Sequence, residues 1–277
     1  MTTGALKQRT ITGILWSSVH RFGTMLISFS VNIVLARLLS PQDFGLFGII
    51  LVFIALSDVF IDGGFGSALI QSKETTEEDY STIFFWNLMV SVVLFVLLFI
   101  SAPFIEQFYQ MKSLSTVLRV QGIILIFNAL SLIQQTQLRR ELRFKALAKL
   151  HMASYATAAV VGILMAVNGF GVWSLVAKHL TVSIVNFVIL WVVSKWRPIR
   201  IFAFQSFKRL FRYGFFIFLT SIVIKLYDNL LSLIIGKVFA VDDLGYYVQA
   251  KKMQQIPVEG LSAVVNQVTF PVFSQLQ

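Results

Sequence analysis

Residues 44–65 read FGLFGIILVFIALSDVFIDGGF, an almost unbroken apolar run whose only charged side chains are Asp58 and Asp62. About 20 helical residues cross the ~30 Å hydrocarbon core of a bilayer, so a run of this length predicts a transmembrane helix. A helix is expected because an open sheet would leave backbone polar groups without partners in lipid. This stretch therefore places the chain among integral membrane proteins.

Similar apolar runs lie on both sides of this one. The composition agrees, because 57% of the residues are hydrophobic, only 13% are charged and the mean hydropathy is +0.79, whereas a soluble domain carries roughly 25% charged residues. We expect an all-α, polytopic membrane helix bundle of about eight transmembrane helices. The other predicted spans cover residues 13–36, 82–103, 116–134, 150–168, 172–193, 214–235 and 257–273.

The Lys and Arg residues outside these spans are distributed unevenly. Most lie on the same side as the N-terminus, notably in clusters at 139–149 and 195–212, while the opposite side carries fewer, among them Lys251 and Lys252. The positive-inside rule places the N-terminus in the cytoplasm. We expect the protein to lie in the cell inner membrane. The net charge of +10 is then a topology signal that also suits anionic membrane lipids, and nucleic-acid binding is not expected.

An internal repeat lies at an ungapped offset of 200 residues. The segment VNIVLARLLSPQDFGLF at 31–47 aligns with LSLIIGKVFAVDDLGYY at 231–247. Both segments end a span that begins on the same side, so the copies run in the same direction, as in transporters built from parallel repeats. We expect a six-helix N-terminal lobe at 1–195, a basic cytoplasmic linker at 196–213 and the first two helices of a C-terminal lobe at 214–277, so that the sequence is an N-terminal fragment.

Polar side chains recur on one face of three predicted spans. A charge near the centre of a transmembrane helix costs at least ~2.5–3.5 kcal/mol, so each one calls for a role. Spacings of three and four residues place such side chains on one helical stripe. The predicted substrate-binding residues are Ser17, Arg21, Thr24, Ser28 and Asn32 in the first span, Ser174, Lys178 and Thr181 in the sixth, and Lys225 in the seventh. The alternative for the small hydroxyl residues is simple packing between helices.

Three acidic residues within spans are the predicted ion-coupling or gating groups. Asp58 and Asp62 lie one turn apart, where they would bind a proton or Na⁺, or would help form a turn at the glycines that follow. Asp228 follows Lys225 by three residues, a spacing that allows a local ion pair. The sequence has no cysteine, no metal-ligand spacing, no P-loop and no nucleophile elbow, so neither a metal, a cofactor nor an enzyme activity is expected.

Several stretches resemble the bacterial oligosaccharide flippases, the polysaccharide-transporter branch of the multidrug/oligosaccharidyl-lipid/polysaccharide flippase superfamily. The most specific is ARLLSPQDFGLFGIILVFIALSDVFIDGGFGSALIQ at 36–71. The others, in order, are LRRELRFKALA at 138–148, GFGVWSLVAKHL at 169–180, WRPIRIF at 196–202, DDLGYYVQAKKMQQIP at 242–257 and FPVFSQLQ at 270–277. The resemblance is greatest to exporters of the colanic-acid or lipopolysaccharide type.

The resemblance implies two helical lobes around a central cavity that opens alternately to the two sides of the membrane. It also implies an undecaprenyl-pyrophosphate-linked oligosaccharide as substrate, for lipopolysaccharide or exopolysaccharide biosynthesis. Cations in a wet cavity suit such an anion: Arg21 would bind the headgroup, with Lys178 and Lys225 assisting.

Three other functions remain open from the sequence. A multidrug or metabolite antiporter of the same superfamily would favour acidic cavity residues, whereas the unpaired charges here are basic. A membrane enzyme such as a polysaccharide polymerase or ligase would be expected to carry a long external loop. A non-transporting scaffold would have other polysaccharide assembly proteins as its partners.

Overall fold

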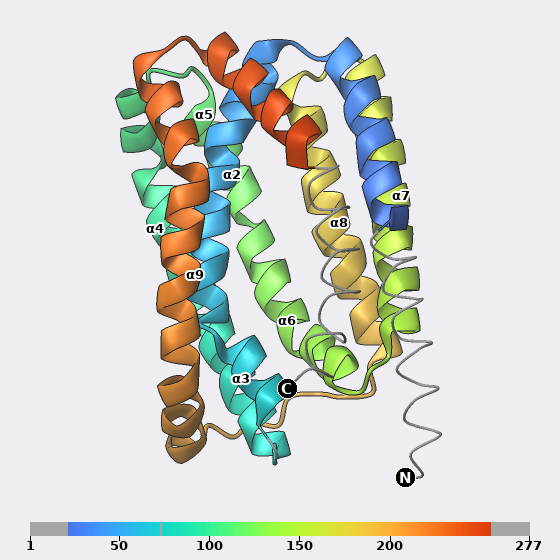
Figure 1. Ribbon diagram of the computed structural model, residues 1–277, viewed down its shortest axis with the longest axis vertical. Coiled ribbons are helices and arrows are strands. Elements are labelled where there is room, and N and C mark those ends of the chain that lie inside the picture. Colours follow the sequence, from blue (N-terminus) through green and yellow to red (C-terminus); the bar gives the residue numbers. More distant parts are fainter. Residues whose placement is uncertain (1–21, 73, 256–277) are drawn as a thin grey trace, which may run out of the picture.

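The computed structural model describes residues 22–72 and 74–255, which form a bundle of long helices with no strand among them (Figure 1). In chain order the helices are helix 22–38, α2 (Pro41–Asp62), α3 (Phe65–Gln71), α4 (Glu77–Tyr109), α5 (Leu114–Gly122), α6 (Ile124–Arg140), α7 (Phe144–Val167), α8 (Val172–Val193), α9 (Phe204–Val238) and helix 241–255.

Within the described residues, six helical stretches are long and apolar enough to cross a membrane. They are α2, α4, α5 with α6, α7, α8 and α9, while helix 22–38 is apolar but shorter. The predicted all-α membrane bundle is confirmed. The count of eight is not, because the first span is described only from residue 22 and the span at 257–273 lies outside the described residues.

The bundle in Figure 1 has an upper and a lower end, each formed by the connections between its helices. The upper end carries the turns at 39–40, 110–113, 168–171 and 239–240. The lower end carries α3 and the connections at 141–143 and 194–203, which belong to the two basic clusters of the sequence.

Local chemistry sets both ends of α2. Ser40 caps the first turn through a capping box, in which Asp43 N donates to Ser40 Oγ and Ser40 N donates to Asp43 Oδ2. Pro41 suits the first helical position because an N–H there would have no helical partner. Gly63 and Gly64 then end the helix with φ angles of 54° and 76°, a conformation that a Cβ atom disfavours. The predicted turn after Asp62 is therefore present.

Two helices differ from the predicted spans. The span at 116–134 is divided into α5 and α6 at Ile123, where a Cβ on Gly122 would lie 3.1 Å from the ring of Phe95. α9 begins at Phe204 rather than at 214, so the second half of the predicted linker is helical. Its first ten residues mix aromatic side chains with Lys208, Arg209 and Arg212, so this part of the helix does not form an apolar run in the sequence.

α2 and helix 241–255 cross near the upper end of the bundle (Figure 1). We call this contact the α2 crossing. Gln42 Nε2 donates to Asp242 Oδ2 at 3.4 Å, and a Cβ on Gly48 would lie 2.7 Å from Val248 Cγ2. In both pairs the two residues lie 200 positions apart, which is the offset of the internal repeat.

Two further contacts in the α2 crossing are reciprocal. A Cβ on Gly45 would lie 2.1 Å from the Val241 carbonyl oxygen, and a Cβ on Gly245 would lie 2.0 Å from the Pro41 carbonyl oxygen. Contacts that recur with the partners exchanged are typical of a two-fold axis. The repeat is therefore expressed in the structure as a local two-fold relation between these helices.

α9 packs along α2, α3 and α4, helices of the first repeat. At the lower end the turn after α2 and helix α9 are in backbone contact, since a Cβ on Gly64 would lie 2.2 Å from the Gly214 carbonyl oxygen. At the upper end Lys237 Nζ donates to the Phe108 carbonyl oxygen at 2.6 Å and lies 4.2 Å from the centroid of its ring.

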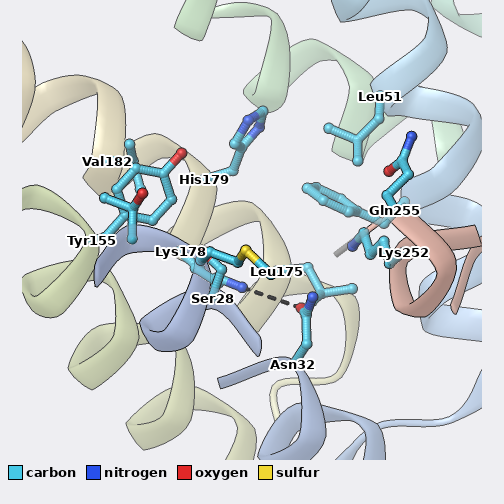
Figure 2. Close-up of a pocket in the computed structure, with 13 residues that line it drawn as sticks. Ser28, Asn32, Leu51, Tyr155, Leu175, Lys178, His179, Val182, Lys252 and Gln255 are labelled. Carbon is cyan, nitrogen blue, oxygen red and sulfur yellow. Dashed lines mark hydrogen bonds between the residues drawn. The ribbon is translucent and has the colours of Figure 1, made fainter. Parts of the chain in front are cut away.

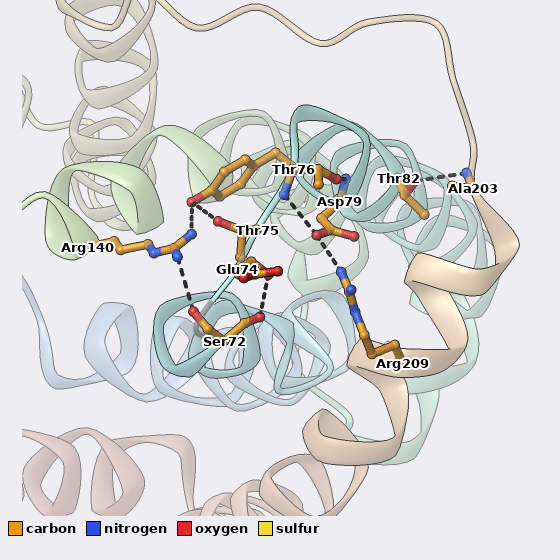
Figure 3. A network of polar contacts seen from close by, with 10 residues as sticks. Ser72, Glu74, Thr75, Thr76, Asp79, Thr82, Arg140, Ala203 and Arg209 are labelled. Carbon is orange, nitrogen blue, oxygen red and sulfur yellow. Dashed lines mark hydrogen bonds and ion pairs between the residues drawn. The ribbon is translucent and has the colours of Figure 1, made fainter.

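The connection at 194–203 is bound to the start of α4. Ser81 Oγ accepts a hydrogen bond from Ile199 N at 3.0 Å. Thr82 Oγ1 accepts one from Ala203 N, also at 3.0 Å (Figure 3). Exposed backbone donors of an irregular segment are thus satisfied by buried hydroxyl groups of a helix. The connection is held against the first six helices rather than hanging free.

An ion pair completes this attachment. Arg209 Nη2 lies 2.6 Å from Asp79 Oδ2, and the Asp79 side chain is fully buried (Figure 3). Asp79 also accepts from Thr76 N in the capping box of α4. The lower part of α9 is therefore fastened to α4.

Candidate functional site

An internal cavity of about 440 Å³ lies between helix 22–38, α2, α7, α8 and helix 241–255 (Figure 2). We call it the central cavity. It lies where helices of the first repeat face a helix of the second. Its lining consists of Thr24, Met25, Ser28, Asn32, Phe47, Leu51, Tyr155, Leu175, Lys178, His179, Val182, Lys252 and Gln255.

The polar stripe predicted for the first span reaches this cavity. Thr24, Ser28 and Asn32, spaced by one helical turn each, all line it. Asn32 is only 8% exposed, so its amide serves the cavity rather than bulk solvent. Ser17 and Arg21, the other predicted members of the stripe, lie outside the described residues.

Lys178 extends from α8 into the central cavity. Its Nζ donates to Asn32 Oδ1 at 3.5 Å (Figure 2). The stem of the side chain passes α7 at Gly162, where a Cβ would lie 3.0 Å from Lys178 Cβ. Glycine at this position lets α7 and α8 pack closely around the lysine.

Lys252 is the second cation of the central cavity and was missed in the sequence. It enters from helix 241–255, on the opposite side of the cavity from α8 (Figure 2). The prediction that Lys252 lies in an external loop is wrong, because residues 241–255 are helical. The internal repeat indicates this helix, because it aligns residues 241–247 with residues 41–47 at the start of α2.

His179 and Tyr155 complete the polar lining. His179 Nδ1 lies 2.7 Å from Nε2 of the buried Gln121, and its ring meets Phe47 edge-on at 5.9 Å. No Asp or Glu occurs among the described residues that line the cavity, and neither Lys178 nor Lys252 has a carboxylate partner there. Two ammonium groups in a low-dielectric site without a counter-charge favour binding of an anion.

The structure does not bring Ser174 and Thr181 to the central cavity. Ser174 is fully buried, and its Oγ has no hydrogen-bond partner in the part of the chain that the structure describes. Thr181 is not among the lining residues either. The stripe on α8 thus contributes Lys178 alone, and a binding role for the two hydroxyl residues stays a prediction.

Lys225 lies elsewhere, in a pocket of about 300 Å³ between α2 and α9 that also contains Asp58, Asp62 and Ser221. It faces these carboxylates and not the central cavity. Lys225 and Asp228 form no ion pair in the described structure, and Asp228 is exposed, with its carbonyl oxygen accepting from Lys251 Nζ. The second repeat therefore supplies Lys252, and not Lys225, to the central cavity.

Asp58 and Asp62 also line a second large cavity, of about 450 Å³, whose lining comes from α2, α3, α6, α7 and α8. We call it the amide cavity, after Asn128, Gln135 and Asn186 in its lining. Tyr155 lines both this cavity and the central cavity. The two cavities are therefore neighbours, with the amide cavity toward the lower end.

The fold and the site together define a class of protein. A multi-pass bundle of membrane helices, with a polar cavity between two repeats of one polypeptide, is the architecture of membrane transporters. The chain belongs to the family described as polysaccharide biosynthesis protein, which matches residues 34–277. The resemblance found in the sequence is thereby confirmed.

Curated relatives match nearly the whole chain. The teichuronic acid biosynthesis protein TuaB of Bacillus subtilis is 27% identical, over 98% of this chain and 56% of that protein. The succinoglycan biosynthesis transport protein ExoT of Rhizobium meliloti is 26% identical (99% and 56%). The lipopolysaccharide biosynthesis protein WzxC of Escherichia coli is 23% identical (99% and 56%). The chain spans about half the length of these relatives.

Solved structures agree on the fold. An inward-facing multidrug resistance MATE family transporter of the MOP superfamily aligns with a TM-score of 0.59 at 16% identity, covering 93% of this chain and 66% of that one. The MATE multidrug transporter DinF-BH aligns with a TM-score of 0.55 at 17% identity, covering 96% and 65%.

Proposed function

We propose that the protein carries lipid-linked oligosaccharides across the bacterial inner membrane for the synthesis of a surface polysaccharide. The observation that supports this most directly is the central cavity, in which Lys178 and Lys252 face each other without a carboxylate. An undecaprenyl-pyrophosphate-linked oligosaccharide is the substrate class that suits this cavity, since its anionic diphosphate joins a polar glycan to an apolar tail.

The proposed orientation follows from charge. The lower end of the bundle carries the clusters at 139–149 and 195–212, which the positive-inside rule assigns to the cytoplasm. The amide cavity and the attachment of 194–203 to α4 then lie on the cytoplasmic side, and the α2 crossing lies on the periplasmic side.

In the proposed mechanism the diphosphate binds between the two lysines while the polyprenyl tail stays in lipid. Lys178 comes from the first repeat and Lys252 from the second, so an anion between them draws the repeats together. A ligand shifts a conformational equilibrium only by its differential affinity for the two states. Bridging of two repeats provides such a difference, and separation at the α2 crossing would open the other side.

The test is the flipping rate of a fluorescent undecaprenyl-diphosphate saccharide in proteoliposomes, read from its accessibility to a membrane-impermeant reductant. Lys178→Ala and Lys252→Ala each remove a charge-assisted contact worth about 1.5–3 kcal/mol. We therefore expect flipping to fall by roughly one to two orders of magnitude.

Lys149→Ala is the matched control, because Lys149 is exposed on α7 and does not line either cavity. It removes the same charge and should flip at the wild-type rate. Wild-type rates for both Lys178→Ala and Lys252→Ala would contradict the proposal.

A further inference from the structure

The amide cavity differs chemically from the central cavity beside it. Its polar lining consists of amides, hydroxyls, two carboxylates and the imidazole of His151, with Arg139 at an exposed edge, and it contains no lysine among the described residues. Its volume of about 450 Å³ lies within the ~300–1,000 Å³ range of small-molecule sites.

One hydrogen-bond chain fixes a carboxylate of this cavity. Ser183 Oγ donates to Asn128 Oδ1, and Asn128 Nδ2 donates to Asp58 Oδ1 at 3.0 Å. The direction of the Asn128 amide is set at both ends, because a serine hydroxyl donates to one end and a carboxylate accepts at the other. Asp58 Oδ2 accepts no hydrogen bond from any described residue, so it remains an acceptor for a ligand.

A second chain fixes a donor. Ser154 Oγ lies 2.8 Å from Asn186 Oδ1 and 3.0 Å from the Leu150 carbonyl oxygen, and its single proton is shared between these two acceptors. Asn186 Nδ2 has no partner within the described structure. Asn186 is 9% exposed and lines the amide cavity. Its amide is therefore held in place by one end while the other end offers an N–H group.

Gln135 adds both kinds of group. It lines the same cavity from α6, and neither its Nε2 nor its Oε1 takes part in a hydrogen bond with the described residues. Unpartnered polar groups at a sheltered position are costly unless a ligand or water satisfies them. The amide cavity thus presents donors and acceptors together, since Gln135, Asn186 Nδ2 and Asp58 Oδ2 have no partners among the described residues.

Sugars and phosphates differ in what they need. Each sugar hydroxyl donates one hydrogen bond and accepts others, so it suits a mixture of amides and carboxylates. Phosphate oxygens only accept and carry negative charge, so Asp58 and Asp62 repel them. The two cavities therefore suit different chemical groups: the lysines of the central cavity suit a diphosphate, and the amides of the amide cavity suit a sugar.

We propose that the amide cavity is the glycan subsite of the transporter, taking an uncharged hexose or N-acetylhexosamine attached to the diphosphate. The sugar would pass Tyr155, which borders both cavities, while the diphosphate stays between Lys178 and Lys252. This inference rests on the proposed function, and it adds which part of the protein recognises the sugar.

The test compares binding of three probes to the full-length protein in nanodiscs. The probes are undecaprenyl diphosphate alone, and the same lipid carrying glucose or N-acetylglucosamine, with Kd measured by thermophoresis. We expect at least one sugar to tighten binding to the wild type by about tenfold, as one or two net hydrogen bonds would. The double variant Gln135→Ala with Asn186→Ala should lose this sugar increment and keep wild-type affinity for the sugar-free lipid.

Two further variants complete the design. Gln137→Ala truncates the same residue type on α6 at a position that does not line the cavity, so it should keep the increment. Lys178→Ala should weaken all three probes by the same factor and keep the ratio between them.

The outcomes are distinct. No sugar increment in the wild type, or an increment that survives Gln135→Ala with Asn186→Ala, overturns the glycan subsite. The second result would agree with the sequence-based prediction of ion coupling at Asp58 and Asp62. Failure of the wild type to bind undecaprenyl diphosphate at all overturns the proposed function instead.

Discussion

Substitution of Gly45 by alanine should open the α2 crossing. The added Cβ would lie 2.1 Å from the Val241 carbonyl oxygen, and the obstacle is backbone, which cannot rotate away as a side chain can. Helix 241–255 must therefore shift away from α2. Overpacking of this kind costs about 1–3 kcal/mol, which corresponds to roughly a 5–150-fold change in the equilibrium between closed and open states.

The assay uses the hydrogen-bonded pair at the crossing. Gln42→Cys with Asp242→Cys places one thiol on each helix, at positions whose side chains now meet at 3.4 Å. The chain has no cysteine of its own, so disulfide formation on mild oxidation in membranes reports this contact alone. Adding Gly45→Ala should lower the cross-linked fraction in proportion to the loss of the closed state.

Gly169→Ala serves as the control, because a Cβ there meets nothing within 4 Å although φ is +78°. Its strain is confined to the turn between α7 and α8, and cross-linking should be unchanged. Cross-linking of the Gly45→Ala protein at the rate of its parent would refute the reasoning, since it would show that the crossing tolerates a Cβ without moving.

Three other substitutions test the structure. Arg209→Ala leaves the buried Asp79 without its ion pair and should destabilise the protein by roughly 1–3 kcal/mol, seen as a lower melting temperature in detergent; an unchanged melting temperature would show that Asp79 is satisfied by its cap alone. Gly64→Ala places a Cβ 2.2 Å from the Gly214 carbonyl oxygen at a φ of +76°, so both strain and overpacking should cost about 2 kcal/mol or more; wild-type thermal stability would contradict that contact. Ser174→Ala should leave flipping and stability unchanged, because the buried Oγ has no partner within the described residues; a loss of flipping would restore its predicted binding role.

The sequence predicted the helices well where lipid decides them. Long apolar runs have one stable solution in a bilayer, and α8 matches the predicted span at 172–193 residue for residue. Prediction failed where a helix faces water or protein instead. The start of α9 and helix 241–255 carry charges, so neither appears as an apolar run.

The site was predicted in part for a related reason. Helical periodicity tells which side chains share a face, so Thr24, Ser28 and Asn32 were grouped correctly. It does not tell which neighbour that face meets. Lys225 sits on a polar stripe just as Lys178 does, yet it faces α2 while Lys178 faces the central cavity. Only the packing of α9 against the first repeat decides this difference.

The attachment of residues 194–203 and Arg209 to α4 has a consequence for biogenesis. Every partner in that attachment precedes helix 241–255 along the chain, and domains generally fold from the N-terminus during synthesis. Helices from the first repeat are therefore already in the membrane when α9 leaves the translocon, and they give it a place to dock. The first repeat acts as a template on which the next helices are assembled, so most of the lining of the central cavity is in place before the ribosome has made the helix that supplies Lys252.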